Sequence, residues 1–364
     1  MALSCGIVGL PNAGKSTVFN ALTRSTQAVA SDYPFATIEP NVGEVRVPDG
    51  RLEVLAEIVH SNRIVHASMR FVDIAGLARG ASSGAGLGNA FLSHIRETDA
   101  IAMVVRCFEA QGVADAEAPP DPLRDIEILD IEMALADLAS LAKRVDKLER
   151  ESRANPKAAE RLEAARGLMR ALENGTPARA FAKDSLEAAL ARETFLLTVK
   201  PLLYVANVGE AQIARLGASA QSVFDLAERE GSRAIAFCAK LEAELAGLSD
   251  DEATVFRKEL GIDRSGLDQL ILQAYDVLGL MTFLTAGEKE VRAWTIEKGS
   301  KAPQAAGKIH SDIERGFIRA EIVSYDDYAR LRSMEAIRSA GLFRSEGKEY
   351  VMREGDVVNF RFNV

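Results

Sequence analysis

The feature that most constrains this sequence is the segment GLPNAGKS at residues 9–16. It matches the pattern G-x-x-x-x-G-K-[ST], and it stands between an apolar run at residues 3–9 and a helical pattern at residues 16–23. Glycines let backbone N–H groups curl around phosphate oxygens, and the N-terminus of a helix adds a partial positive charge. The pattern therefore predicts a strand, a phosphate-binding loop and a helix.

The side chains of this phosphate loop, residues 9–17, have separate expected roles. We expect Lys15 to reach the β- and γ-phosphates of a nucleoside triphosphate, and the Ser16 hydroxyl to coordinate Mg²⁺. Asn12 is a candidate for holding a monovalent cation such as K⁺ near the phosphates, with stabilisation of the turn as the alternative. The predicted nucleotide-binding residues of the loop are Asn12, Ala13, Gly14, Lys15, Ser16 and Thr17.

Two further motifs follow in the order that such a site requires. Residues 73–76 (DIAG) end an apolar run, as a Walker-B DxxG motif does. Asp73 is expected to hold Mg²⁺ through water, and the Gly76 N–H to sense the γ-phosphate. Thr37 is placed to complete the metal shell when the γ-phosphate is present, or else it is an ordinary loop residue. The predicted metal ligands are Ser16, Thr37 and Asp73, and the predicted catalytic residues are Asn12, Lys15, Asp73 and Gly76.

Base recognition is where the sequence departs from a GTPase. GTPases of this type carry N-K-x-D after a core strand, and the aspartate accepts two N–H donors from guanine. Here the apolar run 202–206 ends in Asn207-Val208-Gly209-Glu210. The lysine is replaced by Val208, which is expected to offer an apolar face to the base, and Glu210 is one methylene longer than aspartate. Because unmatched buried polar groups discriminate strongly between ligands, the sequence predicts a preference for ATP over GTP.

A second loop is expected to complete the base pocket. Residues 237–240 (FCAK) follow another apolar run and resemble the loop whose backbone N–H groups contact the base. The alternative is that Asn207 and Glu210 form only a turn or a helix cap. The predicted base-contacting residues are Asn207, Val208, Glu210, Cys238, Ala239 and Lys240.

The residue after the DIAG motif indicates slow catalysis. Ras-like proteins carry a water-orienting glutamine at this position, whereas this chain has Leu77. Leucine can neither orient nor deprotonate water, so we expect slow intrinsic hydrolysis unless another group supplies the electrostatic stabilisation. Arg79, in the glycine-rich stretch that follows, is a candidate for neutralising charge.

The order of the apolar runs predicts the fold class. Five short runs alternate with helical stretches, which is typical of a parallel sheet covered on both faces. The expected fold is therefore α/β, a G-type parallel-sheet domain around the phosphate loop. The five runs are residues 3–9, 69–74, 101–105, 202–206 and 234–237.

One gap between these runs is out of proportion. About a hundred residues separate the third run from the fourth, far more than a helical crossover needs. The excess is charged, with Leu and Ala at helical spacing, and Pro156 and Gly175 stand where a helix can begin and end. We predict an antiparallel helical hairpin that projects from the sheet, with a helical layer packed over the core as the alternative.

The C-terminal segment predicts a further domain. After residue 280 the chain shows strand-like alternation and turns, and it closes with a strand, a turn at residues 354–356 and a final strand. This pattern is typical of a small mixed α+β domain. The resulting division assigns residues 1–124 and 198–280 to a nucleotide-binding domain, 125–197 to the helical insertion and 281–364 to the C-terminal domain.

Composition narrows the partners and the compartment. The net charge of -9 makes free DNA an unexpected partner, because phosphate binding needs clustered Lys and Arg. No apolar run is long enough to span a membrane, and the N-terminus lacks the basic start of a signal peptide. The scattered cysteines and histidines form neither a disulfide framework nor a metal-ligand spacing. These features indicate a cytoplasmic protein.

Taken together, these segments resemble the Obg-like ATPases, also called the YchF family, over essentially the whole length. NVxE in place of NKxD is specific to that group, and Leu77 matches its hydrophobic substitution. The segments that carry the resemblance are residues 9–17, 33–43, 71–82, 207–210 and 293–321.

The resemblance implies a G-type domain, a coiled-coil insertion and a C-terminal TGS domain with a ubiquitin-like β-grasp fold. It also implies Mg²⁺-dependent hydrolysis of ATP with weaker use of GTP. The implied partner is the ribosome, either its large subunit or the whole particle, and the implied role is regulation of translation and stress responses.

Three functions stay open on the sequence. The first is a slow ATPase whose nucleotide state controls docking on the ribosome. The second is a GTPase that assists ribosome assembly through a degenerate base site. The third is a binding module that holds nucleotide with negligible turnover.

Overall fold

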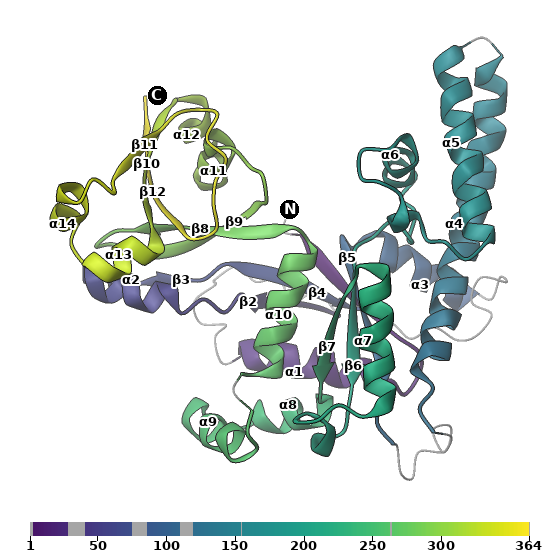
Figure 1. The fold of residues 1–364 in the computed structure, drawn as a ribbon, viewed down its shortest axis with the longest axis horizontal. Helices are drawn as coiled ribbons and strands as arrows, with labels where there is room; N and C mark the ends of the chain where they lie inside the picture. The colour runs from purple at the N-terminus through teal and green to yellow at the C-terminus, as the bar shows by residue number, and fades with distance from the viewer. Residues whose placement is uncertain are drawn as a thin grey trace. The chain divides into compact units, whose positions relative to one another are not determined.

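The computed structural model describes residues 3–27, 41–74, 86–109, 119–153, 155–262 and 264–363. It divides into two compact units, each with its own sheet (Figure 1). The first unit comprises Met1–Val45 and Arg70–Val277, and the second comprises Arg46–Met69 and Leu278–Val364. None of the helices in the described part of the chain combines the length and hydropathy that a membrane span requires.

The sheet of the first unit confirms the five predicted strands and adds one. Its order is β2-β4-β1-β5-β6-β7, and the pairs β1–β4, β1–β5, β5–β6 and β6–β7 are parallel. The added strand β2 is a short edge strand in which buried and exposed residues alternate. Because it contains Gly and Glu, it does not form an apolar run in the sequence. In spatial order the strands are β2 (Val42–Arg46), β4 (Ser68–Asp73), β1 (Ser4–Val8), β5 (Ala100–Arg106), β6 (Leu202–Asn207) and β7 (Arg233–Phe237).

Helices follow the strands of this unit, as the alternating pattern predicts. The side chains of β5 and β6 are almost entirely buried, which fits a sheet covered on both faces. The helices are α1 (Lys15–Gln27), α3 (Gly86–Arg96), α4 (Pro122–Ser152), α5 (Pro156–Glu173), α6 (Leu186–Glu193), α7 (Ala218–Glu230), α8 (Ala239–Leu245), α9 (Asp250–Glu259) and α10 (Gly266–Val277), with short 3₁₀ helices η3 (Ala178–Ala180) and η4 (Glu210–Gln212).

The long insertion forms the predicted hairpin, with the predicted end signals. Asn155 caps α5, accepting a hydrogen bond from the Lys157 N–H at 3.0 Å, and Pro156 occupies the first turn. Gly175, at φ 77°, follows the end of α5 in the left-handed conformation that terminates helices. Figure 1 shows α4 and α5 lying side by side.

The two halves of α4 pack in different environments. Its first half, including Ile126, Leu129 and Met133, belongs to the core of the sheet. Its second half, with Leu141 and Leu148, joins a separate core shared with α5. The sequence left open whether these helices project from the sheet or pack over it. The first half of α4 packs over the sheet, and the second half belongs to the hairpin.

A buried carboxylate marks the change between the two halves. Asp137 is 0% exposed and accepts hydrogen bonds from the backbone N–H groups of Leu197 (2.7 Å) and Thr198 (2.9 Å). The Thr198 hydroxyl donates to the same carboxylate at 2.7 Å. These three bonds attach α4 to the segment that leads into β6.

The second unit is a mixed sheet with short helices, as predicted for the C-terminal segment. Phe283 fills its centre, stacked with Trp294 and edge-on to Phe360. The sheet order is β11 (Arg344–Glu346), β10 (Phe317–Ser324), β12 (Asp356–Phe362), β8 (Leu280–Ala286), β9 (Val291–Glu297) and β3 (Ile64–Val65). The helices are α2 (Arg51–Val59), α11 (Ala302–Ile309), α12 (Ser311–Arg315), α13 (Tyr325–Leu331) and α14 (Met334–Ser339).

Residues 46–69 lie in this second unit, although the sequence-based division places them in the nucleotide-binding domain. Strand β3 pairs in parallel with β9, and the Val291 N–H donates to the Arg63 carbonyl at 2.9 Å. Arg51 forms an ion pair of 2.6 Å with Glu354. These contacts join positions more than two hundred residues apart, which no local pattern reveals.

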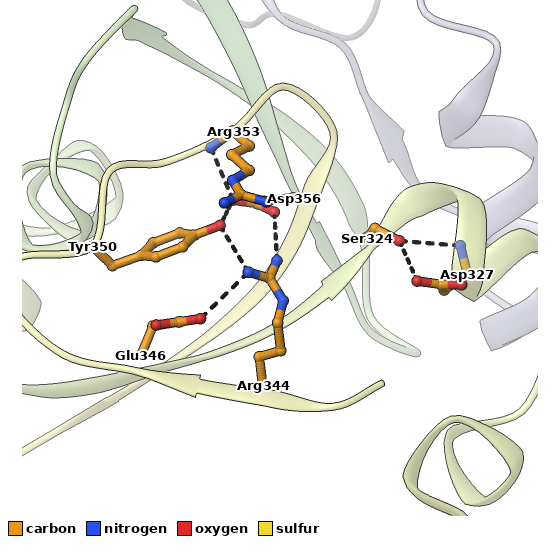
Figure 2. A network of polar contacts seen from close by, with 7 residues as sticks. All are labelled: Ser324, Asp327, Arg344, Glu346, Tyr350, Arg353 and Asp356. Carbon is orange, nitrogen blue, oxygen red and sulfur yellow. Dashed lines mark hydrogen bonds and ion pairs between the residues drawn. The ribbon is translucent and has the colours of Figure 1, made fainter. Parts of the chain in front are cut away.

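The strand expected just before the final turn is absent, apart from an isolated bridge at Val351. A side-chain network shapes this segment instead (Figure 2). Asp356, 2% exposed, accepts from the Tyr350 hydroxyl and the Arg353 N–H, both at 2.9 Å, and from Arg344 at 3.3 Å. Because these hydrogen bonds to Asp356 hold the chain in a loop, residues 350–353 do not form a regular β-ladder.

Candidate nucleotide-binding site

The phosphate loop has the backbone that its glycines predict. It connects the end of β1 at Val8 to the start of α1 at Lys15. Gly14 has φ 95°, a conformation that L side chains rarely adopt, and an added Cβ would lie 2.3 Å from the Asn207 amide nitrogen. At Gly9 a Cβ would lie 2.4 Å from the Val104 carbonyl oxygen. Gly9 is therefore required by the close approach of another strand's backbone, and Gly14 by its own backbone conformation and the nearby Asn207 side chain.

Lys15 lies over the loop at the N-terminus of α1. Its ammonium donates to the Leu10 carbonyl at 2.9 Å, and only 8% of the residue is exposed. Burial lowers the pKa of Lys15 below its ordinary value, and the negative charge of Asp73 opposes that shift. A buried cation held by one carbonyl is ready to exchange this contact for phosphate oxygens.

Two of the three residues predicted to bind Mg²⁺, Ser16 and Asp73, lie in the described part of the chain, and they fit that ion. Ser16 is exposed in the first turn of α1, where its hydroxyl is accessible. One oxygen of Asp73, Oδ1, is buried without a hydrogen-bond partner, and burial raises the pKa of this carboxyl while Lys15 opposes the shift. The described residues contain no group of three or more His, Cys, Asp or Glu side chains arranged for a metal. Mg²⁺ is usually bound by one or two protein oxygen ligands together with phosphates and water, and Ser16 and Asp73 offer oxygen ligands of this kind.

Asn207 joins the phosphate loop to the base loop, defined here as residues 207–210 and 237–240. Its side-chain amide donates to the Ala13 carbonyl at 2.9 Å, and its side-chain carbonyl accepts from the Ala239 N–H at 3.1 Å. The residue is only 3% exposed. The sequence suggested that Asn207 either contacts the base or forms a turn. The structure shows a different role, since Asn207 links the two loops.

Val208 is not placed as the sequence analysis expected. Its side chain is 2% exposed and packs in the hydrophobic core, while its N–H donates to the Phe237 carbonyl at 2.9 Å. The described structure therefore gives Val208 no apolar face open to a base. The main effect of having valine at position 208 is therefore that the lysine found there in GTPases is absent.

Glu210 and Lys240 are brought together across the base loop. Their side chains form an ion pair of 3.0 Å, with Glu210 47% and Lys240 74% exposed. Between them in the loop, Cys238 and Ala239 are buried, and α8 begins at Ala239. The carboxylate that replaces the guanine-reading aspartate is thus held by a cation of the same loop.

Glu242 is a buried residue of this region that the sequence analysis missed. It accepts hydrogen bonds from the Gly266 N–H at 2.7 Å and the Ser265 hydroxyl at 3.3 Å. Burial raises the pKa of Glu242, and these hydrogen bonds oppose the shift. The contacts attach α8, and with it the base loop, to the start of α10. The one local signal is Ser265, a residue type that favours helix starts.

Several predicted site residues lie outside the described residues. They include the metal ligand Thr37 and the catalytic Gly76, and their roles stay predictions. Leu77 and Arg79 also lie outside the described part of the chain.

Comparison with known proteins gives matches over the full length. A family model named YchF-GTPase_C, described as a protein of unknown function, matches residues 280–363, and one described as 50S ribosome-binding GTPase matches residues 4–136. The chain is 48% identical to the ribosome-binding ATPase YchF of Bacillus subtilis and 46% identical to that of Escherichia coli O157:H7, covering 100% of each chain. A solved structure of the Schizosaccharomyces pombe YchF GTPase superposes with a TM-score of 0.89 at 36% identity, covering 99% of this chain and 98% of that one.

Proposed function

Because this chain belongs to the YchF family, we propose that it binds and slowly hydrolyses ATP with Mg²⁺ and docks on the ribosome in a nucleotide-dependent way. The observation that carries the proposal is the phosphate loop, with its buried Lys15 and with Asp73 beside it. Full-length relatives are named as ribosome-binding ATPases, which supports the same reading.

The chain's own residues divide the work of binding and hydrolysis. The phosphate loop and the N-terminus of α1 bind the phosphates, and Lys15 neutralises charge on the transferred group. Ser16 and Asp73 would hold Mg²⁺, directly and through water, together with Thr37. When bound, the ion would offset the negative charge that develops on the phosphates. The exposed Asn12, at φ 63°, is proposed as the loop position that holds K⁺.

The preference for ATP is argued from the base loop. Guanine recognition needs a carboxylate free to accept two N–H donors, whereas Glu210 is one methylene too long and already pairs with Lys240 at 3.0 Å. The relatives' names differ on the nucleotide, since the bacterial proteins are called ATPases and the yeast protein a GTPase. The base loop therefore carries this part of the proposal.

A competition experiment tests the nucleotide. A fluorescent ATP analogue bound to the full-length protein is displaced by ATP or by GTP in the presence of Mg²⁺. We expect ATP to displace it at a concentration at least about tenfold lower, since leaving a buried polar group of the base site unpaired costs about 1–3 kcal/mol. Tighter displacement by GTP would support the assembly GTPase instead, and tight binding with no measurable turnover would support the nucleotide-holding module.

For ribosome docking we propose the tip of the α4–α5 hairpin together with the second unit. Deleting all of 125–197 is not a clean test, because Ile126, Leu129 and Met133 belong to the sheet core. Replacing only residues 147–165 by a short Gly-Ser linker spares that core.

In co-sedimentation, we expect the shortened protein to bind ATP like wild type and to pellet less with ribosomes. Separated large and small subunits show which particle is bound, and a duplex DNA control is expected to give no binding. Unchanged pelleting of the shortened protein would exclude the hairpin tip as a docking surface.

A further inference from the structure

A cavity lies in the first unit, at the ends of the parallel strands opposite to the phosphate loop. Asp99, Pro201 and Ser232 line it, and they immediately precede the parallel strands β5, β6 and β7. Asn207 and the base loop follow the other ends of the same strands. The cavity has a volume of about 660 Å³, which is in the range of small-molecule sites.

Five cations line this cavity, which we call the basic pocket, and three of them form no ion pair within the described residues. The Arg192 guanidinium donates to the Lys183 carbonyl at 2.8 Å. The Lys200 ammonium donates to the carbonyls of Arg96 (3.1 Å) and Thr98. Within the described residues, neither Lys183, Arg192 nor Lys200 forms an ion pair with a carboxylate. The positive charges of Lys183 and Arg192 are therefore available to an anion, whereas the carboxylates of Asp99 and Asp137 already act on Lys200.

The carboxylates that line the same pocket are each engaged by donors. In addition to its ion pair with Arg179, Glu230 accepts a hydrogen bond from the buried Tyr204 hydroxyl at 2.9 Å, so its carboxylate is held by neighbouring groups of the protein. The remaining lining charges therefore leave the pocket with an excess of positive charge. The pairs are Asp99 with the Ser4 N–H (2.8 Å), Glu230 with Arg179 (3.4 Å) and Asp276 with Arg233 (2.5 Å).

An exposed aromatic residue at the pocket has an unusual backbone. Phe195 lines the cavity, is 68% exposed and has φ 52°, in the left-handed region that glycine normally fills after a helix. The turn is held by hydrogen bonds from the Phe195 N–H to the Arg192 carbonyl and from the Leu196 N–H to the Ala191 carbonyl. This backbone conformation favours a small residue, so an exposed ring at this position beside the cations of the pocket points to a ligand contact. Phe181 supplies a second ring to the lining.

We propose that the basic pocket is a second ligand site, separate from the phosphate loop, that binds a nucleoside phosphate. Lys183 and Arg192 contact the phosphate, and Phe195 stacks on the base. Cations beside exposed aromatic rings are the combination that binds single nucleotides and unpaired strands. The ligand is either a free nucleotide or one nucleotide of a single-stranded RNA, since both present the same chemistry.

The test uses the full-length protein with the phosphate loop saturated by ADP and Mg²⁺. Uridine 5′-monophosphate is titrated by calorimetry, and fluorescein-labelled decauridylate by fluorescence anisotropy. We expect at least one probe to bind, and Lys183→Glu and Phe195→Gly each to weaken it by at least about fivefold. Binding of the monophosphate indicates a free nucleotide, whereas binding of the decamer alone indicates an RNA strand.

The substitutions separate binding from folding. Phe195→Gly removes the ring but suits the left-handed backbone, so its melting temperature should equal or exceed that of wild type. Lys258→Glu on α9 makes the same charge change at an exposed position outside both the pocket and the hairpin tip, and it should leave binding unchanged. The proposal is overturned if neither probe binds the wild type, or if both pocket variants bind like wild type. It is also overturned if inorganic phosphate competes as well as the nucleotide and Phe195→Gly has no effect.

Discussion

The phosphate loop and the base loop adjoin the same site, but different forces shape them. The phosphate loop takes its conformation from its own residues: glycines at Gly9 and Gly14, and the start of a helix at Lys15. The base loop is shaped by distant partners, since Val208 bonds to the strand of Phe237 and Glu210 pairs with Lys240. A consensus pattern can identify the first kind of loop, whereas the second kind depends on which strands become neighbours.

Asn207 is the residue at which these two loops meet. It donates to Ala13 of the phosphate loop and accepts from Ala239 of the base loop. A substitution in the phosphate loop should therefore affect phosphate binding alone, and one in the base loop should affect base selectivity alone. A substitution of Asn207 should affect both.

The largest expected effect is on the phosphate side. Lys15→Ala should lower ATP turnover at least about a hundredfold, because it removes a preorganised cation from the transferred phosphate. Folding should change little, since the lysine makes a single hydrogen bond within the loop. Steady-state hydrolysis and thermal unfolding, measured on the same preparation, check both statements. A variant with near-normal turnover would remove Lys15 from the catalytic residues.

A smaller effect, but one on both loops, is expected at Asn207. Asn207→Ala removes two buried hydrogen bonds and leaves the Ala13 carbonyl and the Ala239 N–H without partners, which should cost about 1–3 kcal/mol of unfolding free energy. Affinity for ADP and ATP should fall together, because both loops loosen. Urea unfolding and nucleotide titration measure the two effects.

The matched control for that change is Asn20→Ala, at an exposed position of α1, which should alter neither stability nor affinity. If Asn207→Ala kept wild-type stability and affinity, the two loops would not depend on this cross-link.

The smallest effect, on selectivity alone, is expected at Glu210. Glu210→Asp shortens the carboxylate to the length used in GTPases and weakens its pair with Lys240. We expect the ratio of GTP to ATP affinity to rise about threefold to tenfold, within the range for one altered polar contact. Stability should change by less than about 0.5 kcal/mol, because the pair is exposed.

Lys240→Ala removes the same ion pair without changing the carboxylate length, so it separates the two causes. A selectivity rise in Lys240→Ala equal to that in Glu210→Asp would assign the effect to the pair alone. Unchanged selectivity in both variants would remove Glu210 from base recognition.

Much of the fold and part of the site could be predicted from local pattern. Each of the five apolar runs became a strand, and Pro156 and Gly175 mark the ends of α5 as predicted. Local pattern failed where burial overrides it. Val208 was expected to face the base, but it completes the core beneath the loop, and Asp356 draws the expected strand before the final turn into a loop.

The sequence by itself determined the phosphate loop, the α/β fold and the two hairpin helices, because spacing, capping residues and glycine conformation act within a few residues of one another. The tertiary structure alone decided that residues 46–69 join the C-terminal unit, that α4 serves two cores, and that Asn207 connects two loops. Each of these outcomes depends on hydrogen bonds and packing between positions far apart in the chain. The free energy of such contacts exists only once the chain has brought the partners together.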